Sequence, residues 1–361
     1  MIHDHFINQI EMYNFRCFDY LKVENLKRVN LLGGDNNIGK SGFLEALEAV
    51  TKTKNPSSLL IALRDIINRR QAYNAQFSEF DVIRYGEENL KFETNTISIN
   101  FQIKSDEKLS NFGEQLSIFD GSDQNKENGE IDENLFVEIK VNNEYEKISY
   151  SKFMNIISRK GVTSFLLRNT RLNENVDFIN STIIDERKLA SIYGYIVDMG
   201  MMDIINTFLK EFDPRIESLI IRPTETYSVF KIKLKDRKEP VLLSSMGGGL
   251  NRYIAIVCAI WKSKDGQLLI DEVENGIHYT KYEKLWEIIF EESIKANCQI
   301  FITTHSKECI EAFTRAAERY DNENIKYLNF SRTVDNSDKI VVTVLDSVGL
   351  ENNFELGLDI R

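Results

Sequence analysis

The residues best suited to chemistry lie at positions 34–41, which read Gly-Asp-Asn-Asn-Ile-Gly-Lys-Ser. The spacing G-x-x-x-x-G-K-S is typical of a phosphate-binding loop. Glycines at both ends let the backbone approach a phosphate closely, and the amide N–H groups between them can point at its oxygens. Lys40 would reach the β and γ phosphates, and Ser41 would hold Mg²⁺. We therefore predict a nucleotide site at Gly34, Asn36, Asn37, Gly39, Lys40 and Ser41.

The sequence on either side of this loop supports that interpretation. Residues 28–32 form a short apolar stretch that predicts a buried strand, and apolar residues at helical spacing predict a helix over 41–50. A strand, a glycine loop and a helix in this order place a helix N-terminus against the phosphates. The alternative is a glycine turn that contains a lysine by chance. Such a turn would not require a strand before it and a helix after it.

A second candidate site element is the stretch 267–272, Gln-Leu-Leu-Ile-Asp-Glu. An apolar strand that ends in two acids is the Walker B pattern. Asp271 would hold Mg²⁺, directly or through water, and Glu272 would lie beside the γ-phosphate and polarise the attacking water. Because Gln267 is not apolar, we expect only three deeply buried positions in this strand.

Two further segments could complete the site. Residues 298–306 form an apolar run that ends in Thr-Thr-His-Ser before a helix that begins near residue 307. His305 would thus lie at the same sheet edge as the phosphate loop and contact the γ-phosphate or the attacking water. A second glycine loop, with Ser245 and Gly247, opens an apolar helix at 250–261. One nucleotide does not need two such loops, so we expect this one to cap the nucleotide of another subunit, a flexible turn being the alternative.

The order of these motifs resembles the ABC-type ATPase heads of the SMC and RecF class. The finer pattern is similar to the OLD-like AAA family ATPases, many of which are bacterial anti-phage components. It is carried by residues 7–18, the Ser-Met-Gly-Gly-Gly at 245–249, the Asp-Glu-Val-Glu-Asn-Gly-Ile-His at 271–278 and the Leu-Asp-Ile-Arg at 358–361.

The resemblance implies ATP and Mg²⁺ as ligands and a role for each matching residue. Ser245 and Gly247 would contact the γ-phosphate across a dimer, Glu272 would be the hydrolytic base and His305 the switch histidine. The loop 274–278 would cross the dimer interface. Gly248 and Tyr279 depart from the residues usual in relatives, Glu and Pro. No glutamine loop is marked by its context, and three residues remain candidates for it: Gln71, Gln76 and Gln102.

The fold class that follows is α/β, an ABC-type P-loop ATPase head with mixed sheets, helices on both faces, a short helical insertion and no long coiled coil. We expect four segments: 1–104 with Walker A, a mobile acidic loop at 105–134, strands and a helical insertion at 135–235, and 236–361 with the signature loop, Walker B and the switch histidine. Alternating patterns predict strands at 97–103 and 135–141, helix over 186–212 and a hairpin over 216–234.

The composition of the chain limits the kinds of partner and the compartment that we expect. The 361 residues carry a net charge of −11, which argues against an evenly basic nucleic-acid binder. A basic run after the first helix is either a local patch or a solvated helix face; it consists of Lys52, Lys54, Arg64, Arg69 and Arg70. No apolar run is long enough for a membrane span, and the first residues lack the basic and apolar segments of a signal peptide, so we expect neither. Four cysteines without a C-x-x-C pair indicate buried free thiols and a cytoplasmic protein.

Two functions of different classes remain open. In the first, ATP closes a homo-dimer or larger homo-oligomer that controls a separate effector, a nuclease or toxin, in anti-phage defence. The chain ends about 55 residues after His305, so we expect no Toprim nuclease domain in it. In the second, the protein is a DNA-binding repair or maintenance ATPase of the RecF or SMC type. The acidic charge and the missing coiled-coil arms favour the first.

Overall fold

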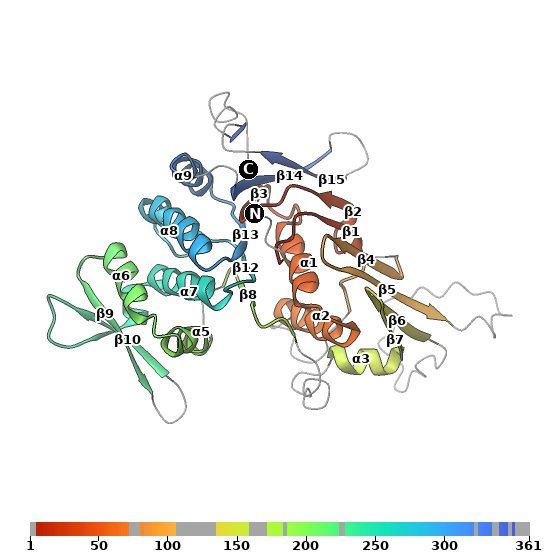
Figure 1. The fold of residues 1–361 in the computed structure, drawn as a ribbon, viewed down its shortest axis with the longest axis horizontal. Coiled ribbons are helices and arrows are strands. Elements are labelled where there is room, and N and C mark those ends of the chain that lie inside the picture. Colours follow the sequence, from red (N-terminus) through yellow and green to blue (C-terminus); the bar gives the residue numbers. More distant parts are fainter. Residues whose placement is uncertain are drawn as a thin grey trace, which may run out of the picture. The chain divides into compact units, whose positions relative to one another are not determined.

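The computed structural model describes residues 5–71, 80–84, 86–105, 135–158, 172–182, 186–223, 228–320, 324–333, 339–345 and 349–350 (Figure 1). The chain divides into two compact units. The first consists of Met1–Ile10, Leu21–Thr51 and Asn173–Arg361, and the second of Glu11–Tyr20 and Lys52–Leu172. These units interleave along the chain, whereas the predicted segments were consecutive stretches divided after residues 104, 134 and 235; that division stays a prediction.

A six-stranded sheet forms the centre of the first unit, in the order β15-β14-β3-β13-β12-β8. All neighbours are parallel except β15, which pairs antiparallel with β14. The strands are β3 (Val29–Gly34), β8 (Val176–Ile179), β12 (Gln267–Ile270), β13 (Gln299–Thr303), β14 (Ile325–Arg332) and β15 (Ile340–Leu345). The carboxyl ends of β3, β13 and β12 are neighbours, so the three segments that follow them meet at one sheet edge.

Helices cover both faces of this sheet (Figure 1). On one side lies α1 (Lys40–Lys52), whose Phe43 ring contacts Phe330 of β14 edge to face. On the other, α7 (Gly248–Lys262) packs against α5 (Glu186–Asp198), α6 (Met202–Phe212) and α8 (Tyr282–Lys295), and α8 packs against α9 (Lys307–Ala317). The predicted strand 28–32 and the helices at 41–50, 250–261 and near 307 are confirmed.

The strand before Asp271 is buried more completely than predicted. All four residues of β12 are buried, Gln267 included. The prediction of only three buried positions was wrong, because a buried amide is tolerated where its polar atoms have partners. The Gln267 side chain donates to the carbonyl oxygen of His5 at 2.5 Å, and its backbone N–H donates to that of Asn175 at 3.0 Å.

The segment 186–242 precedes the second glycine loop. The predicted helix over 186–212 is confirmed as α5 and α6 with one break, where Gly200 adopts φ +69°. The predicted hairpin is β9 (Ile216–Pro223) with β10 (Ser228–Leu234), joined by β11 (Val241–Leu242) in a small antiparallel sheet. A 3₁₀ turn, η2 (Leu243–Met246), then leads into α7.

The second unit is built on a six-stranded sheet in the order β2-β1-β4-β5-β6-β7, in which β4 to β7 pair antiparallel. Its elements are β1 (Ile10–Phe15), β2 (Phe18–Val23), α2 (Pro56–Arg70), β4 (Asn89–Thr94), β5 (Ser98–Ser105), β6 (Leu135–Val141), β7 (Glu144–Ser149) and α3 (Tyr150–Ser158). The predicted strands are confirmed as β5 and β6, paired with Phe101 opposite Ile139. Apart from Ser105, which ends β5, the predicted mobile loop lies outside the described residues.

Several remaining candidates fall in this unit. Gln71 follows the end of α2 and Gln102 lies in β5, while Gln76 lies outside the described residues. In the basic run, Arg64 is buried and pairs with Asp65 at 3.1 Å.

Among the described residues of the whole chain, none of the helices is long and apolar enough to span a membrane.

Candidate active site

The loop between β3 and α1 has the backbone that its glycines predict. Gly34 and Gly39 adopt φ +127° and +103°, and Asn37 also has a positive φ, +60°. A Cβ on Gly34 would lie 2.3 Å from the carbonyl oxygen of Phe330, so close packing as well as conformation requires glycine there. Residues 35–37 are exposed, which leaves the loop open to a ligand at the N-terminus of α1.

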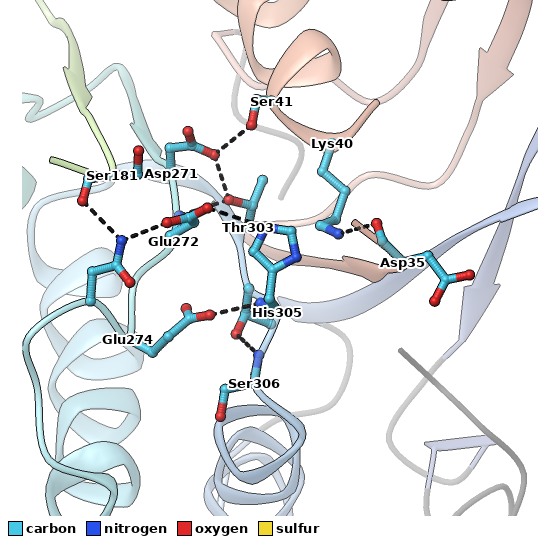
Figure 2. A network of polar contacts seen from close by, with 12 residues as sticks. Asp35, Lys40, Ser41, Ser181, Asp271, Glu272, Glu274, Thr303, His305 and Ser306 are labelled. Atoms are coloured by element: carbon cyan, nitrogen blue, oxygen red, sulfur yellow. Dashed lines mark hydrogen bonds and ion pairs between the residues drawn. The ribbon is translucent and has the colours of Figure 1, made fainter. Parts of the chain in front are cut away.

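Lys40 lies inside this loop, with only 3% of its surface exposed. Its Nζ donates to the carbonyl oxygen of Gly34 at 2.5 Å. It also donates to that of Asp35 at 2.8 Å (Figure 2). Burial lowers the pKa of Lys40 to about 8, although the nearby carboxylates oppose this shift. The ammonium is thus held by neutral oxygens, and phosphate oxygens would supply the opposite charge that it lacks.

Ser41, Asp271 and Thr303 form a hydrogen-bonded group (Figure 2). Oδ1 of Asp271 accepts from the Ser41 hydroxyl at 3.0 Å and from the Thr303 hydroxyl at 2.7 Å. The Thr303 hydroxyl also accepts from the backbone N–H of Glu272 at 2.8 Å. Hydroxyl and carboxylate oxygens are the ligands that Mg²⁺ prefers, so the predicted pair Ser41 and Asp271 converges as a magnesium site requires. Thr303 was missed, and its place at the end of β13 was the available signal.

Glu272 and His305, predicted as base and switch, lie together. Oε1 of Glu272 is 3.3 Å from Nε2 of His305 (Figure 2). The backbone N–H of His305 donates to Oε1 of Glu274 at 2.7 Å, which holds the end of β13 against the turn after β12. Glu272 adopts φ +51°, a conformation uncommon outside glycine that tends to mark functional sites.

A buried arginine that was not predicted holds the turn after β12. Arg252 of α7 donates from its guanidinium to the carbonyl oxygens of Asn180 at 2.6 Å, Asp271 at 2.5 Å and Glu272 at 2.7 Å. Burial lowers the pKa of Arg252, and the neighbouring carboxylates oppose this. Only its position one turn into the helix after the second glycine loop could have suggested a role.

The second glycine loop is exposed. Ser245, in η2, and Gly247, with φ +93°, are both exposed. A Cβ on Gly247 or Gly248 would meet no atom within 4 Å. Within the described residues, no hydrogen bond joins Ser245 or Gly247 to residues 34–41. Gly249, in contrast, packs tightly, since a Cβ there would lie 2.2 Å from the carbonyl oxygen of Gly276.

Comparison with known proteins bears on both fold and activity. Residues 168–310, which include Asp271, Glu272 and His305, match the family model described as an AAA ATPase domain. The chain is 26% identical over 340 residues to an ATP/GTP phosphatase of Helicobacter pylori, covering 87% of this chain and 89% of that protein. It is 26% identical over 187 residues to structural maintenance of chromosomes protein 6 of Saccharomyces cerevisiae, covering 50% of this chain and 15% of that protein.

Among solved structures, an SMC head bound to the C-terminal winged-helix domain of ScpA superimposes with a TM-score of 0.51. The two share 14% identity, over 94% of this chain and 98% of that chain. The likeness confirms the predicted α/β head fold with mixed sheets. The matched ATPase domain and the similarity to an ATP/GTP phosphatase confirm the prediction that the chain binds and hydrolyses ATP.

Proposed function

We propose that this ATPase is Mg²⁺-dependent and that ATP-dependent association of its heads controls a separate effector protein. In this reaction Lys40 neutralises the β and γ phosphates, and Ser41 and Asp271 hold Mg²⁺, which would stabilise charge on the phosphate oxygens. Glu272 takes the proton of the attacking water, and His305 contacts the γ-phosphate or that water. The convergence of these side chains at one sheet edge supports the assignment.

The proposal that the heads associate rests on the exposed second glycine loop. Ser245 and Gly247 are exposed at the N-terminus of α7, with free space around Gly247 and Gly248. A helix N-terminus with exposed amide groups favours an anion. Because the chain already has a phosphate loop for its own nucleotide, the anion that best fits this second loop is the γ-phosphate held by another copy.

The proposed physiological role is anti-phage defence by a cytoplasmic homo-dimer or larger homo-oligomer. It rests on the resemblance of residues 245–249 and 271–278 to the OLD-like family and on the net charge of −11. An acidic ATPase suits a protein partner, such as a nuclease or toxin, better than a polyanion. ATP binding would close the assembly around this effector or hold it inactive, and hydrolysis would release it.

Mixing two inactive variants tests the assembly. Lys40→Ala removes the phosphate contact of one copy, and Ser245→Arg blocks the open loop of the other. If the loop acts on the partner's nucleotide, each mixed dimer retains one intact composite site, and the mixture regains turnover that neither variant shows alone. ATP should also stabilise the dimer in light scattering, because a ligand bound across an interface favours association. Zero recovery with mixed dimers demonstrably present would show that the loop does not act across a dimer.

A DNA-binding repair or maintenance ATPase is the alternative. The similarity to structural maintenance of chromosomes protein 6 favours it, whereas the acidic charge opposes it. The two functions differ in whether the purified chain binds duplex DNA tightly at physiological salt.

A further inference from the structure

Both oxygens of the Glu272 carboxylate have partners in the structure. Oε1 faces His305, and Oε2 accepts a hydrogen bond from Nδ2 of Asn275 at 2.5 Å. The same Nδ2 donates to the carbonyl oxygen of Ser181 at 2.9 Å (Figure 2). The Asn275 amide therefore bridges Glu272 and the main chain that follows β8.

This bridge constrains a side chain that is otherwise poorly restrained. The terminal torsion of a glutamate has broad minima, so the backbone alone does not fix the carboxylate plane. The Glu272 side chain is 32% exposed, which leaves room for it to turn toward solvent. A hydrogen bond from a neutral amide to a carboxylate is charge-assisted and stronger than one between neutral groups. Ser181 fixes the amide in turn, so Asn275 sets where Oε1 points.

We infer that Asn275 is a positioning residue for hydrolysis, one that holds Oε2 of Glu272 so that Oε1 faces His305 and the attacking water. This inference rests on the proposed assignment of Glu272 as the base. The amide keeps its own protons, so it orients the carboxylate without competing for the proton that Glu272 takes from water.

The position of Asn275 links this orientation to the second glycine loop. Asn275 lies in the turn 273–276, whose last residue, Gly276, has φ +77°. Residues 276 and 278–280 are exposed. Gly276 packs directly on Gly249 of α7. A displacement of the N-terminus of α7 would therefore be transmitted through this turn to the Asn275 amide and so to the base.

The variant Asn275→Leu keeps the size of the side chain and removes its donors. We expect kcat for ATP to fall about 10- to 100-fold, the loss typical of one hydrogen bond to a charged group. KM for ATP should stay within about twofold, because the Asn275 side chain bonds to Ser181 and Glu272 and, among the described residues, not to Lys40. Asn100→Leu, which replaces an exposed asparagine of β5, is the matched control and should not change turnover. If Asn275→Leu does not fold by circular dichroism, Asn275→Ala replaces it.

The double variant Glu272→Gln, Asn275→Leu separates positioning from a general structural effect. If Asn275 acts through Glu272, the residual turnover of Glu272→Gln should not fall further when Asn275 is also replaced. An equal loss in both backgrounds, a rise in KM with kcat unchanged, or wild-type kcat in Asn275→Leu would overturn the inference. Failure of the proposed base looks different, since Glu272→Gln would then hydrolyse ATP at the wild-type rate.

Discussion

At the scale of single residues, the proposed roles separate nucleotide binding from hydrolysis. Lys40 is buried, its Nζ donates to carbonyl oxygens, and burial lowers its pKa to about 8. Glu272 and His305 lie beyond Asp271, at the ends of the neighbouring strands. We therefore expect substitutions in the two groups to affect different steps.

Lys40→Ala should abolish ATP binding, because no other described ammonium group lies within the phosphate loop. Glu272→Gln should bind ATP normally but hydrolyse it roughly 10²–10⁴ times more slowly, the usual contribution of a positioned base. Calorimetry with ATP and Mg²⁺ measures the first effect and phosphate release the second. Lys54→Ala, an exposed lysine beyond α1, serves as the control and should leave both unchanged. Normal turnover in Glu272→Gln would remove Glu272 from the mechanism.

At the scale of elements, the sequence predicts the parts of the site that local patterns determine. Strand, glycine loop and helix are adjacent in the chain, so their periodicity and spacing identify β3 and α1. Ligands bind at the carboxyl ends of parallel strands, so the segments that follow β3, β12 and β13 were expected to meet at one sheet edge. This is why Lys40, Asp271 and His305 could be grouped in advance.

Contacts between elements distant in sequence could not be predicted in this way. Arg252 donates to carbonyl oxygens after β12, and this depends on how α7 packs. The hydrogen bond from Asn275 to Ser181 depends in the same way on the position of β8. Neither contact is marked by hydrophobic periodicity in the sequence. The burial of Gln267 depends on the N-terminal segment, 262 residues away in the chain. A polar side chain in a strand predicts an exposed position. It can nevertheless be buried when a residue distant in sequence supplies its hydrogen-bond partner.

The contact of Gly249 with Gly276 gives a prediction at the same scale. Gly249→Ala would place a methyl group 2.2 Å from the Gly276 carbonyl oxygen, so the turn or α7 must move. We expect a loss of about 1–3 kcal/mol in unfolding free energy, typical of overpacking. Gly248→Ala is the matched control, since its Cβ meets nothing within 4 Å and alanine favours helix by up to about 1 kcal/mol. Chemical denaturation measures both, and equal stability of the two variants would contradict the contact.

At the scale of the whole molecule, the first unit buries three of the four cysteines. Cys258, Cys298 and Cys309 are buried free thiols, as expected from the sequence, whereas Cys17 is exposed. Burial raises the pKa of each of the three buried thiols, which keeps them protonated and unreactive.

A thiol reagent should therefore modify one cysteine rapidly in the native protein and all four after denaturation. The Cys17→Ser variant should lose the rapid phase. ATP with Mg²⁺ should slow the remaining reaction, because a ligand that binds the folded state suppresses the opening that exposes these thiols. Two or more rapid thiols in the native protein would show that the core of the first unit is looser than described.

The charge of the whole chain favours control of a protein effector over DNA binding. A net charge of −11 opposes binding to the DNA polyanion, and Arg64 of the basic run is already buried and paired with Asp65. We expect the purified chain to leave a plasmid intact in the presence of ATP and Mg²⁺, and to bind duplex weakly, with affinity that falls steeply as salt rises.

Protection against phage should then require a second protein, and should be lost in the Glu272→Gln variant if hydrolysis releases the effector. The measurement is plaque formation on cells that express the chain with and without its genomic neighbour. Duplex binding that persists at about 200 mM salt, where a purely electrostatic contact set has lost several decades of affinity, would favour the DNA-binding function. Metal-dependent cleavage of the plasmid by the single chain would refute control of a separate nuclease, because the cutting activity would then reside in this polypeptide.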